Sequence, residues 1–176
     1  MEAPVITQAF LRSVLRYNRR TGIFTWLERA DVRPQWNGRY AGKRAGSEWS
    51  PDGGKNKYIV IRLLDWPFMA HRLAILYVTG RWPRREVDHK DLDGINNRWL
   101  NLRRATKAQN GANRGANKNS KTGIKGVTKV GRRYRATIQS EGHWQQVGSF
   151  ATEAEAQAAY AAAAARLHGK FARTAA

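Results

Sequence analysis

The chain has 176 residues, with 32 Lys or Arg against 13 Asp or Glu, and its formal net charge is +19. It contains no cysteine, which excludes disulfide scaffolds, thiolate zinc sites, iron–sulfur clusters and cysteine nucleophiles. No stretch approaches the ~18 apolar residues that a membrane span needs, and the N-terminus lacks the pattern of a secretory signal, so we expect a soluble, cytoplasmic protein.

The first elements in chain order are a helix and a strand. Thr7 is a typical capping residue, and the apolar residues after it follow helical spacing, which predicts a helix that ends near Asn18. A strand is expected at residues 23–26. Residues 31–56 are rich in glycine and polar side chains and have no clear period, so they predict long loops with one short strand at most.

The middle of the chain predicts a strand followed by a helix. Apolar and polar residues alternate over residues 57–64, which is typical of a strand, and Trp66-Pro67 is expected to end it. Residues 69–78 have the composition of a helix, and Gly80 is expected to end it.

A second, smaller module is predicted after a linker. Residues 111–125 are rich in glycine, asparagine and basic residues, which favours a basic linker between a domain at 1–110 and a module at 126–173. Three strand-like runs and one helix, capped by Thr152, are expected in this module: 126–130, 133–139, 143–150 and 152–167.

The positive charge indicates a polyanionic partner. Residues 117–140 contain seven basic residues and no acidic one. Such a field attracts phosphate backbones, and the net charge of the whole chain would be self-repulsive without an anionic partner. A merely solvated surface is the alternative for any single run, but the composition as a whole favours nucleic acid.

The residues with the strongest chemical signal lie between 87 and 110, where a strand, a loop, a second strand and a helix are predicted. His89 can act as a general base, because an unperturbed imidazole titrates near ~6.5. Asp88 and Asn110 offer the oxygen ligands that a magnesium-type ion prefers. Because neighbours in a strand point to opposite faces, Asp88 and His89 can serve one site only if the strand is irregular or ends there.

This segment resembles the HNH nuclease motif, in the variant of phage and intron homing endonucleases that has asparagine at the last position. The resemblance covers about residues 68–114. We expect the nuclease core as a whole to span about residues 66–114. It implies that His89 is the general base, that Asp88 and Asn110 bind one divalent ion, magnesium or manganese, and that Asn101 braces the loop through backbone hydrogen bonds. It also implies a ββα-metal fold, a phage or mobile-element origin with a bacterial host cell, and cleavage to 5′-phosphate and 3′-hydroxyl ends.

Other polar residues in this part of the chain have two interpretations each. Asp91 and Asp93 start like a calcium loop, but the glutamate of an EF-hand is missing, so we interpret them as turn formers. His71 is either a structural histidine or part of the active site. Arg114 would share a helix face with Asn110 and contact phosphate, or else be solvated. His143 and His168 are expected to be surface or turn residues.

The C-terminal module is similar to the APETALA2-type DNA-binding domain over about residues 120–173, through GV at 126, the run YRATI at 134 and GSF at 148. The resemblance implies three antiparallel strands packed on one helix, with the sheet in the major groove. Alternation would place Arg133, Arg135, Thr137 and Gln139 outward. For Trp144, DNA contact and core packing remain alternatives. The candidate DNA-binding residues of the chain are Arg114, Lys118, Lys121, Lys125, Lys129, Arg133, Arg135, Gln139, Trp144 and Gln145.

These observations predict an α+β protein that is a divalent-metal-dependent, site-specific endonuclease of double-stranded DNA, acting as a nicking or homing enzyme and favoured as a monomer. Two alternatives are a non-cutting DNA-binding regulator on an inactive nuclease core and a basic RNA-binding protein. The intact Asp88, His89, Asn101 and Asn110 argue against the first, and the absence of the usual RNA-binding motifs argues against the second.

Overall fold

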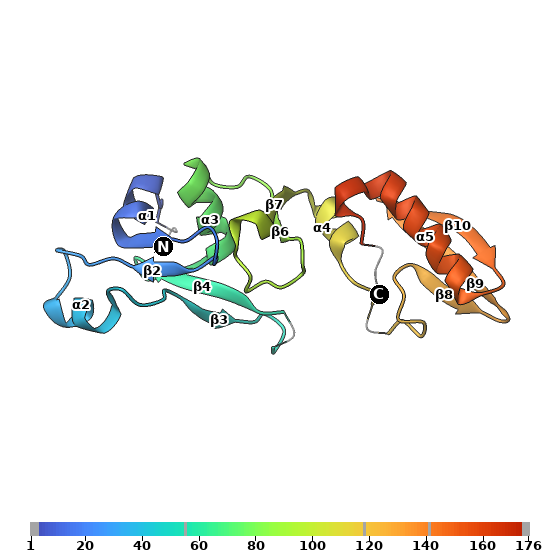
Figure 1. The fold of residues 1–176 in the computed structure, drawn as a ribbon, viewed down its shortest axis with the longest axis horizontal. Coiled ribbons are helices and arrows are strands. Elements are labelled where there is room, and N and C mark those ends of the chain that lie inside the picture. Colours follow the sequence, from blue (N-terminus) through green and yellow to red (C-terminus); the bar gives the residue numbers. More distant parts are fainter. Residues whose placement is uncertain (1–3, 55, 118, 141, 174–176) are drawn as a thin grey trace. The chain divides into compact units, whose positions relative to one another are not determined.

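The computed structural model describes residues 4–54, 56–117, 119–140 and 142–173 (Figure 1). Its contacts divide the chain into two compact units, Met1–Arg104 and Ala105–Ala176. The division therefore lies between Arg104 and Ala105 and not after residue 110, and the helix that was expected to end the nuclease core belongs to the second unit. Both units combine helices with small sheets, in line with the mixed class that the sequence predicts.

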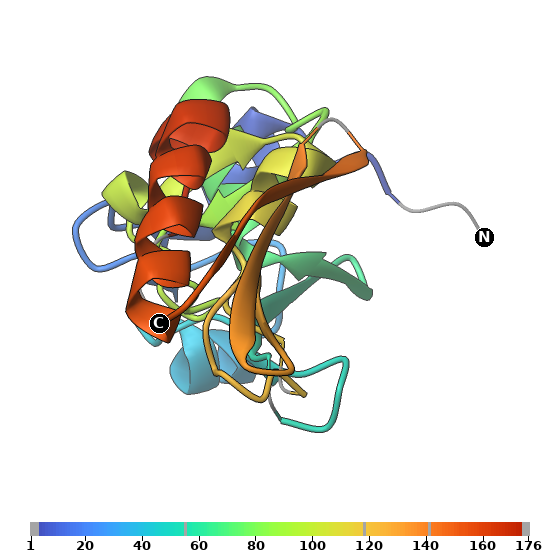
Figure 2. The ribbon, with the colours of Figure 1, turned by 90° about the vertical axis from the view of Figure 1, so that its right-hand side faces the viewer.

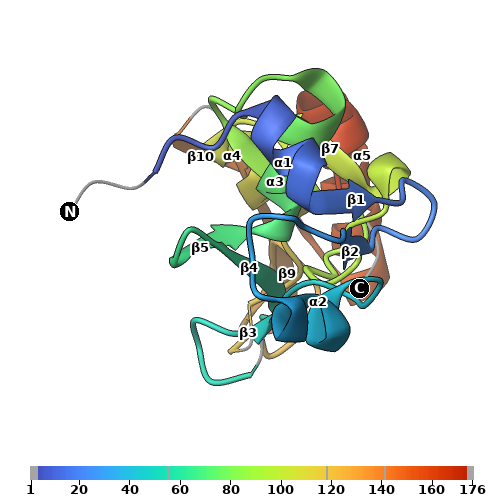
Figure 3. The ribbon, with the colours of Figure 1, turned by 90° about the vertical axis from the view of Figure 1, so that its left-hand side faces the viewer.

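In its described residues, the N-terminal unit has four helices or helical turns interleaved with short strands. They are α1 Gln8–Val14, β1 Leu15–Tyr17, β2 Phe24–Trp26, α2 Pro34–Tyr40, β3 Ser47–Trp49, β4 Tyr58–Leu63, β5 Trp66–Met69, α3 Ala70–Thr79, β6 Glu86–His89, η1 Trp99–Asn101 and β7 Leu102–Ala105. The strands pair as β1-β2, as β3-β4-β5 and as β6-β7. Figure 3 shows α1 beside α3, which the contacts between the two helices confirm.

The first helix starts where the sequence predicts and ends earlier. The Thr7 hydroxyl accepts a hydrogen bond from the amide of Phe10 at 3.1 Å, as expected of a capping residue. The prediction that the helix continues to near Asn18 is wrong. Leu15 and Tyr17 instead form β1, which pairs with β2 and buries both side chains.

Two further expectations for this unit are wrong. Residues 34–40 form α2, with Pro34 at its start, where the missing amide hydrogen of proline costs nothing. Aromatic packing supports this helix, since the Trp36 ring lies 5.3 Å from that of Trp26. Trp66-Pro67 does not break the sheet but lies in β5, an edge strand, where proline is tolerated.

The core of the N-terminal unit joins the helices to the sheets. It contains large aliphatic and aromatic side chains that are almost fully buried, among them Leu11, Phe24, Ile61, Leu73 and Leu76. The alternation of buried and more exposed residues along β4 agrees with the predicted strand. This core lies under the elements that carry the candidate catalytic residues, because Val87 and Leu102 of the β6-β7 pair belong to it.

The C-terminal unit begins with α4 Lys107–Asn113 and continues with β8 Val127–Val130, β9 Arg133–Ser140, β10 His143–Phe150, α5 Glu153–His168 and η2 Gly169–Phe171. The strands form an antiparallel sheet in the order β10-β9-β8. Figure 2 shows α5 lying along this sheet, in agreement with its contacts to all three strands. The Thr152 capping box that the sequence predicts is present, with Glu155 as its partner.

The sheet of this unit has one apolar and one polar face. Ala136 and Ile138 are buried against α5, whereas Arg133, Arg135 and Gln139 are exposed, as alternation predicts. Gly126 brings the start of β8 close to the helix, because a Cβ there would lie 2.2 Å from the ring of Tyr160. Within the described residues, no helix has the length and apolar character to cross a membrane.

Candidate active site

The predicted Asp-His pair stands at the end of strand β6. Asp88 and His89 are both buried, with 3% and 6% of their surface exposed. The strand stops at His89, whose carbonyl accepts the amide of Leu92 at 3.0 Å in a turn. Because the strand ends at His89, the side chains of Asp88 and His89 can serve the same site.

His89 is oriented by a residue that the sequence analysis did not single out. The Nε2 atom of His89 lies 3.0 Å from Oδ1 of Asn97, while Nδ2 of Asn97 donates to the carbonyl of Ile95 at 3.4 Å. An amide oxygen only accepts hydrogen bonds, so Nε2 of a neutral His89 carries the hydrogen. The lone pair that can take up a proton is then on Nδ1.

Asn97 is itself held by the N-terminal hairpin. It is 2% exposed, and its carbonyl oxygen accepts a hydrogen bond from the hydroxyl of Tyr17 at 2.6 Å. Burial raises the pKa of Tyr17, so the hydroxyl remains a donor over the whole physiological range. Gly22, at a φ of +74°, fits directly against this loop, since a Cβ there would lie 2.3 Å from the carbonyl carbon of Asn97. Residues of the N-terminal region thus buttress the predicted catalytic loop.

Asn101 holds the loop together, as the resemblance implies. Its Oδ1 accepts the amide of Asp91 at 3.2 Å, and its Nδ2 donates to Asp91 Oδ1 at 2.9 Å and to the carbonyl of Asn96 at 2.8 Å. The backbone of Asn101 adds a further bond, because its carbonyl accepts the amide of Lys90 at 3.0 Å. The bracing contacts are present, and a catalytic contribution of Asn101 stays a prediction.

Asp91 and Asp93 act as turn formers, as predicted. The carboxylate of Asp91 accepts the amide of Asp93 at 2.9 Å, and that of Asp93 accepts the amide of Ile95 at 3.1 Å. Partial burial alone would raise the pKa of Asp91, but hydrogen bonds from Asn101, the Asp93 amide and Asn96 outweigh it and hold that pKa below its usual value. The Asp91 carboxylate is therefore charged at neutral pH and organises the loop.

Asp88 pairs with an arginine on the neighbouring strand. Nε of Arg103, on β7, donates to Oδ2 of Asp88 at 2.7 Å, and both side chains are largely buried. This partner was not predicted from the sequence, although opposite charges on two paired strands are a recognisable signal. The pair neutralises a buried carboxylate, which would otherwise be costly, and holds it in one orientation.

His71 belongs to the surroundings of His89. Its ring, near the start of α3, is 5.1 Å from that of His89 and 5.8 Å from that of Tyr58. Burial, followed by the charges of His89 and Arg72, lowers the pKa of His71 to about 3. Among the described residues, its buried Nδ1 has no hydrogen-bond partner. His71 is thus a neutral ring against the candidate base, and a direct role for it stays a prediction.

Asn110, the other predicted metal ligand, is part of the C-terminal unit. It lies in α4, whose start is fixed by a capping box between Thr106 and Gln109. The amide of Asn110 donates to the carbonyl of Thr106 at 2.9 Å, so the residue stands one turn into the helix, as expected. Among the described residues, no group of three or more His, Asp or Glu side chains could hold a metal ion. A magnesium-type ion needs only one or two protein ligands, so the assignment of Asp88 and Asn110 stays a prediction.

The candidate DNA-binding residues differ in their surroundings. Lys118 lies outside the described residues. Lys125 is half-buried and donates to two backbone carbonyls, so it is not the free surface cation that the basic linker predicts. Trp144 is 70% exposed, which excludes the core alternative for this side chain. The others are exposed in the C-terminal unit: Arg114, Lys121, Lys129, Arg133, Arg135, Gln139 and Gln145.

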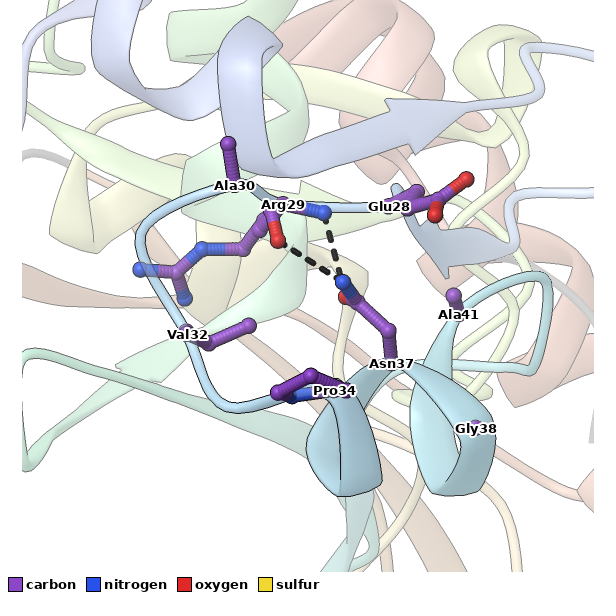
Figure 4. A pocket seen from close by; sticks show the side chains of 8 residues that line it. All are labelled: Glu28, Arg29, Ala30, Val32, Pro34, Asn37, Gly38 and Ala41. Carbon is purple, nitrogen blue, oxygen red and sulfur yellow. Dashed lines mark hydrogen bonds between the residues drawn. The ribbon is translucent and has the colours of Figure 1, made fainter.

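A hollow of about 850 Å³ lies elsewhere in the N-terminal unit (Figure 4). Asn37 bridges it, accepting from the amide of Arg29 at 3.1 Å and donating to the Arg29 carbonyl at 2.7 Å. Its lining contains none of the predicted catalytic or metal-binding residues, so it is separate from the candidate active site. The lining residues are Glu28, Arg29, Ala30, Val32, Pro34, Asn37, Gly38 and Ala41.

Comparisons with known proteins identify the central segment. Residues 68–112 match the family described as HNH endonuclease. A protein of Acanthamoeba polyphaga mimivirus, named an uncharacterized HNH endonuclease, is 32% identical over 121 residues, which is 68% of this chain and 63% of that protein. The chain thus spans less than two thirds of the length of this relative. No solved structure matches the chain.

The family match covers both strands of the candidate site and most of α4, and it supports the HNH resemblance that the residues indicate. Residues 68–112 are therefore similar to an HNH endonuclease domain. The match ends before the C-terminal sheet, so the resemblance of residues 120–173 to the APETALA2-type domain stays a prediction.

Proposed function

We propose that the protein is a divalent-metal-dependent endonuclease of double-stranded DNA, with His89 as its general base. The observation that carries the proposal is the buried contact between His89 and Asn97 at the end of β6. The similarity to an HNH endonuclease domain and the relative named as an HNH endonuclease support the same reaction class. The reaction would leave 5′-phosphate and 3′-hydroxyl ends.

The role of His89 follows from its tautomer. With the hydrogen on Nε2 and directed at Asn97, Nδ1 accepts a proton from the attacking water. The imidazolium that results is stabilised by the same Asn97 oxygen, which remains an acceptor. Asn97 is thus a positioning residue, and Tyr17 in turn holds its backbone.

A divalent ion fits the chemistry of the two remaining residues. Asp88 supplies a carboxylate oxygen and Asn110 an amide oxygen, the hard ligands that magnesium or manganese prefers. When bound, such an ion would stabilise the charge on the scissile phosphate and on the departing 3′ oxygen. Arg103 donates to Oδ2 of the buried Asp88 carboxylate and holds it in one orientation.

The C-terminal sheet is the proposed DNA-recognition surface. Its outward face presents Arg133, Arg135 and Gln139, and Trp144 stands exposed on β10. Arginine pairs bidentately with guanine in the major groove, and lysine binds phosphate without reading sequence. Target-site selectivity, a nicking or homing role, action as a monomer, and a phage origin with a place in the bacterial cytoplasm belong to this proposal.

One observation favours the second candidate, a DNA-binding regulator that does not cut. Arg103 occupies Oδ2 of Asp88, the carboxylate that would bind the metal. A permanent ion pair at that position would replace the divalent ion and leave DNA binding intact. The two candidates differ in one measurable property, metal-dependent hydrolysis.

The experiment incubates supercoiled plasmids carrying random-sequence inserts with the protein and with His89→Ala, in magnesium, in manganese and in chelator. The proposed enzyme produces relaxed or linear DNA only with metal and only with His89. The variant should lose about 10²–10⁴-fold in rate while keeping its DNA affinity. Tight binding with no product in either metal would favour the regulator, and equal loss of binding and cutting in the variant would refute the role of His89.

A further inference from the structure

Helix α4 packs against the turn η2, which follows α5. Ala105, just before the helix, and Ala112, within it, form a buried cluster with Phe171, which lies in the turn η2 directly after α5. Phe171 is 4% exposed, so nearly all of this residue is withdrawn from water. The segment that follows the C-terminal helix therefore returns to pack on α4, as the contacts between α4 and η2 confirm.

The other end of α4 is closed by a lysine. Nζ of Lys125 donates to the carbonyl of Ala112 at 2.5 Å and to that of Gly111 at 3.2 Å. The last carbonyls of a helix have no partner within it, and a positive charge there is favourable to the helix dipole. Burial, followed by the charges of Arg114 and Arg173, lowers the pKa of Lys125 to about 8.

These two contacts matter because α4 is very short. It has seven residues, and isolated helices shorter than about 12 residues are marginal in water. The Thr106 capping box supports its start, but packing must support the rest. Asn110 stands between the cap and the carbonyls that Lys125 binds, so its orientation depends on both.

We propose that Phe171 and Lys125 are positioning residues for Asn110, so that cutting depends on an intact C-terminal unit. The inference rests on the proposed function, in which Asn110 is a metal ligand. It differs from the expectation of a nuclease domain at 1–110 that is separable from its recognition module. Removal of residues 126–173 would remove the Phe171 support and abolish cutting along with recognition.

The test compares Lys125→Met and Phe171→Ala with Arg166→Met in the full-length protein. Arg166→Met removes one positive charge from an exposed position of the same unit that is not among the candidate DNA-binding residues. Plasmid cleavage is followed against magnesium concentration, and DNA affinity is measured separately. Loss of an outer partner of a metal ligand typically weakens metal affinity about 10–100-fold. We expect a rise of this size in half-saturating magnesium for Phe171→Ala, about tenfold for Lys125→Met, and none for Arg166→Met.

Hydrogen exchange gives a readout that does not depend on activity. Amides of residues 107–113 should lose protection in Phe171→Ala and Lys125→Met, while those of residues 86–89 keep theirs, and Phe171→Leu should restore most of it. Lower DNA affinity with an unchanged magnesium response in both variants would overturn the inference. If Phe171→Ala unfolds the whole sheet, Lys125→Met alone decides, because it leaves the apolar cluster intact.

The failure of the inference and that of the proposed function are distinguishable. A wild-type protein that cuts no DNA in any metal would overturn the proposed function and with it the metal role of Asn110. Protection of residues 107–113 would then still show whether Phe171 and Lys125 hold α4. A wild-type protein that cuts, with variants that leave both magnesium response and protection unchanged, would overturn only the positioning role.

Discussion

The two units of the molecule are built on cores of different kinds. The N-terminal core contains leucine, isoleucine, phenylalanine and tyrosine side chains that are nearly inaccessible to water. Four of the seven buried residues in the main C-terminal cluster are alanine, and Tyr160 is the large side chain among them. Because burial energy scales with apolar area, the second unit has much less of it to hold its fold.

Apart from Asn110, which belongs to the C-terminal unit, the candidate functional residues follow the same division. The candidate base and Asp88 are buried, and a hydrogen bond from His89 to Asn97 and one from Arg103 to Asp88 fix them. The candidate DNA-binding side chains, such as Arg135 and Trp144, are exposed on a thin sheet. General base catalysis needs a fixed geometry, whereas phosphate binding needs accessible charge. A large core thus supports the proposed chemistry, and a small one suffices for recognition.

The largest expected effect is a difference in stability between the two units when one aromatic ring is removed from each core. Tyr160→Ala should cost about 3–5 kcal/mol and unfold the C-terminal unit, because little else fills that cluster. Phe24→Ala removes a comparable ring from the N-terminal core and should leave that unit folded, at lower stability. Urea unfolding followed by hydrogen exchange in each unit measures both. A single transition that shifts equally in both variants would contradict independent cores.

A second prediction concerns the fixed geometry in the N-terminal unit. Asn97→Ala should slow cleavage by about 10–100-fold, because His89 loses the acceptor that sets its tautomer, and DNA affinity should stay unchanged. Asn97→Asp keeps an oxygen acceptor in the same place and is the matched control. Plasmid cleavage and binding assays measure the two properties. Equal rates in Asn97→Ala and wild type would remove Asn97 from the mechanism.

The third prediction uses the depressed pKa of His71. Its folded pKa of about 3 lies below the ordinary value of 6.5, so the unfolded chain takes up a proton first as the pH falls. The contribution of His71 to stability is complete above about pH 6.5 and is lost progressively below it, on the order of 2 kcal/mol at pH 5. His71→Phe should abolish that loss in urea unfolding at pH 7 and pH 5. An unchanged acid sensitivity would show that other groups cause it.

The smallest expected effect tests the exposed charges. Arg135→Ala should reduce the slope of log affinity against log salt by about 0.9, the value for one lost phosphate contact, or relax sequence preference if it reads a base. Arg84→Ala removes the same charge from an exposed position of the N-terminal unit and should change the slope less. Filter binding at several salt concentrations checks this. Equal slopes in the two variants would place recognition outside the β9 face.

Features that depend on residues close together in the sequence could be predicted from the sequence alone. The capping residues Thr7, Thr106 and Thr152 accept bonds from amides three residues away, so local pattern was enough to place them. Alternation along β9 and the strand, loop, strand and helix order around His89 are local in the same sense. The segment that the family match covers was recognisable for this reason.

Features that depend on residues far apart in the sequence could be seen only in the folded structure. The early end of α1 follows from pairing with β2, and α2 exists because Trp36 packs on Trp26. Asn97 orients His89 only because the loop folds back, and Lys125 closes α4 from thirteen residues away. Contacts of this kind form between residues that are far apart in the sequence. Their free energy depends on the whole fold and cannot be predicted from any short stretch of residues.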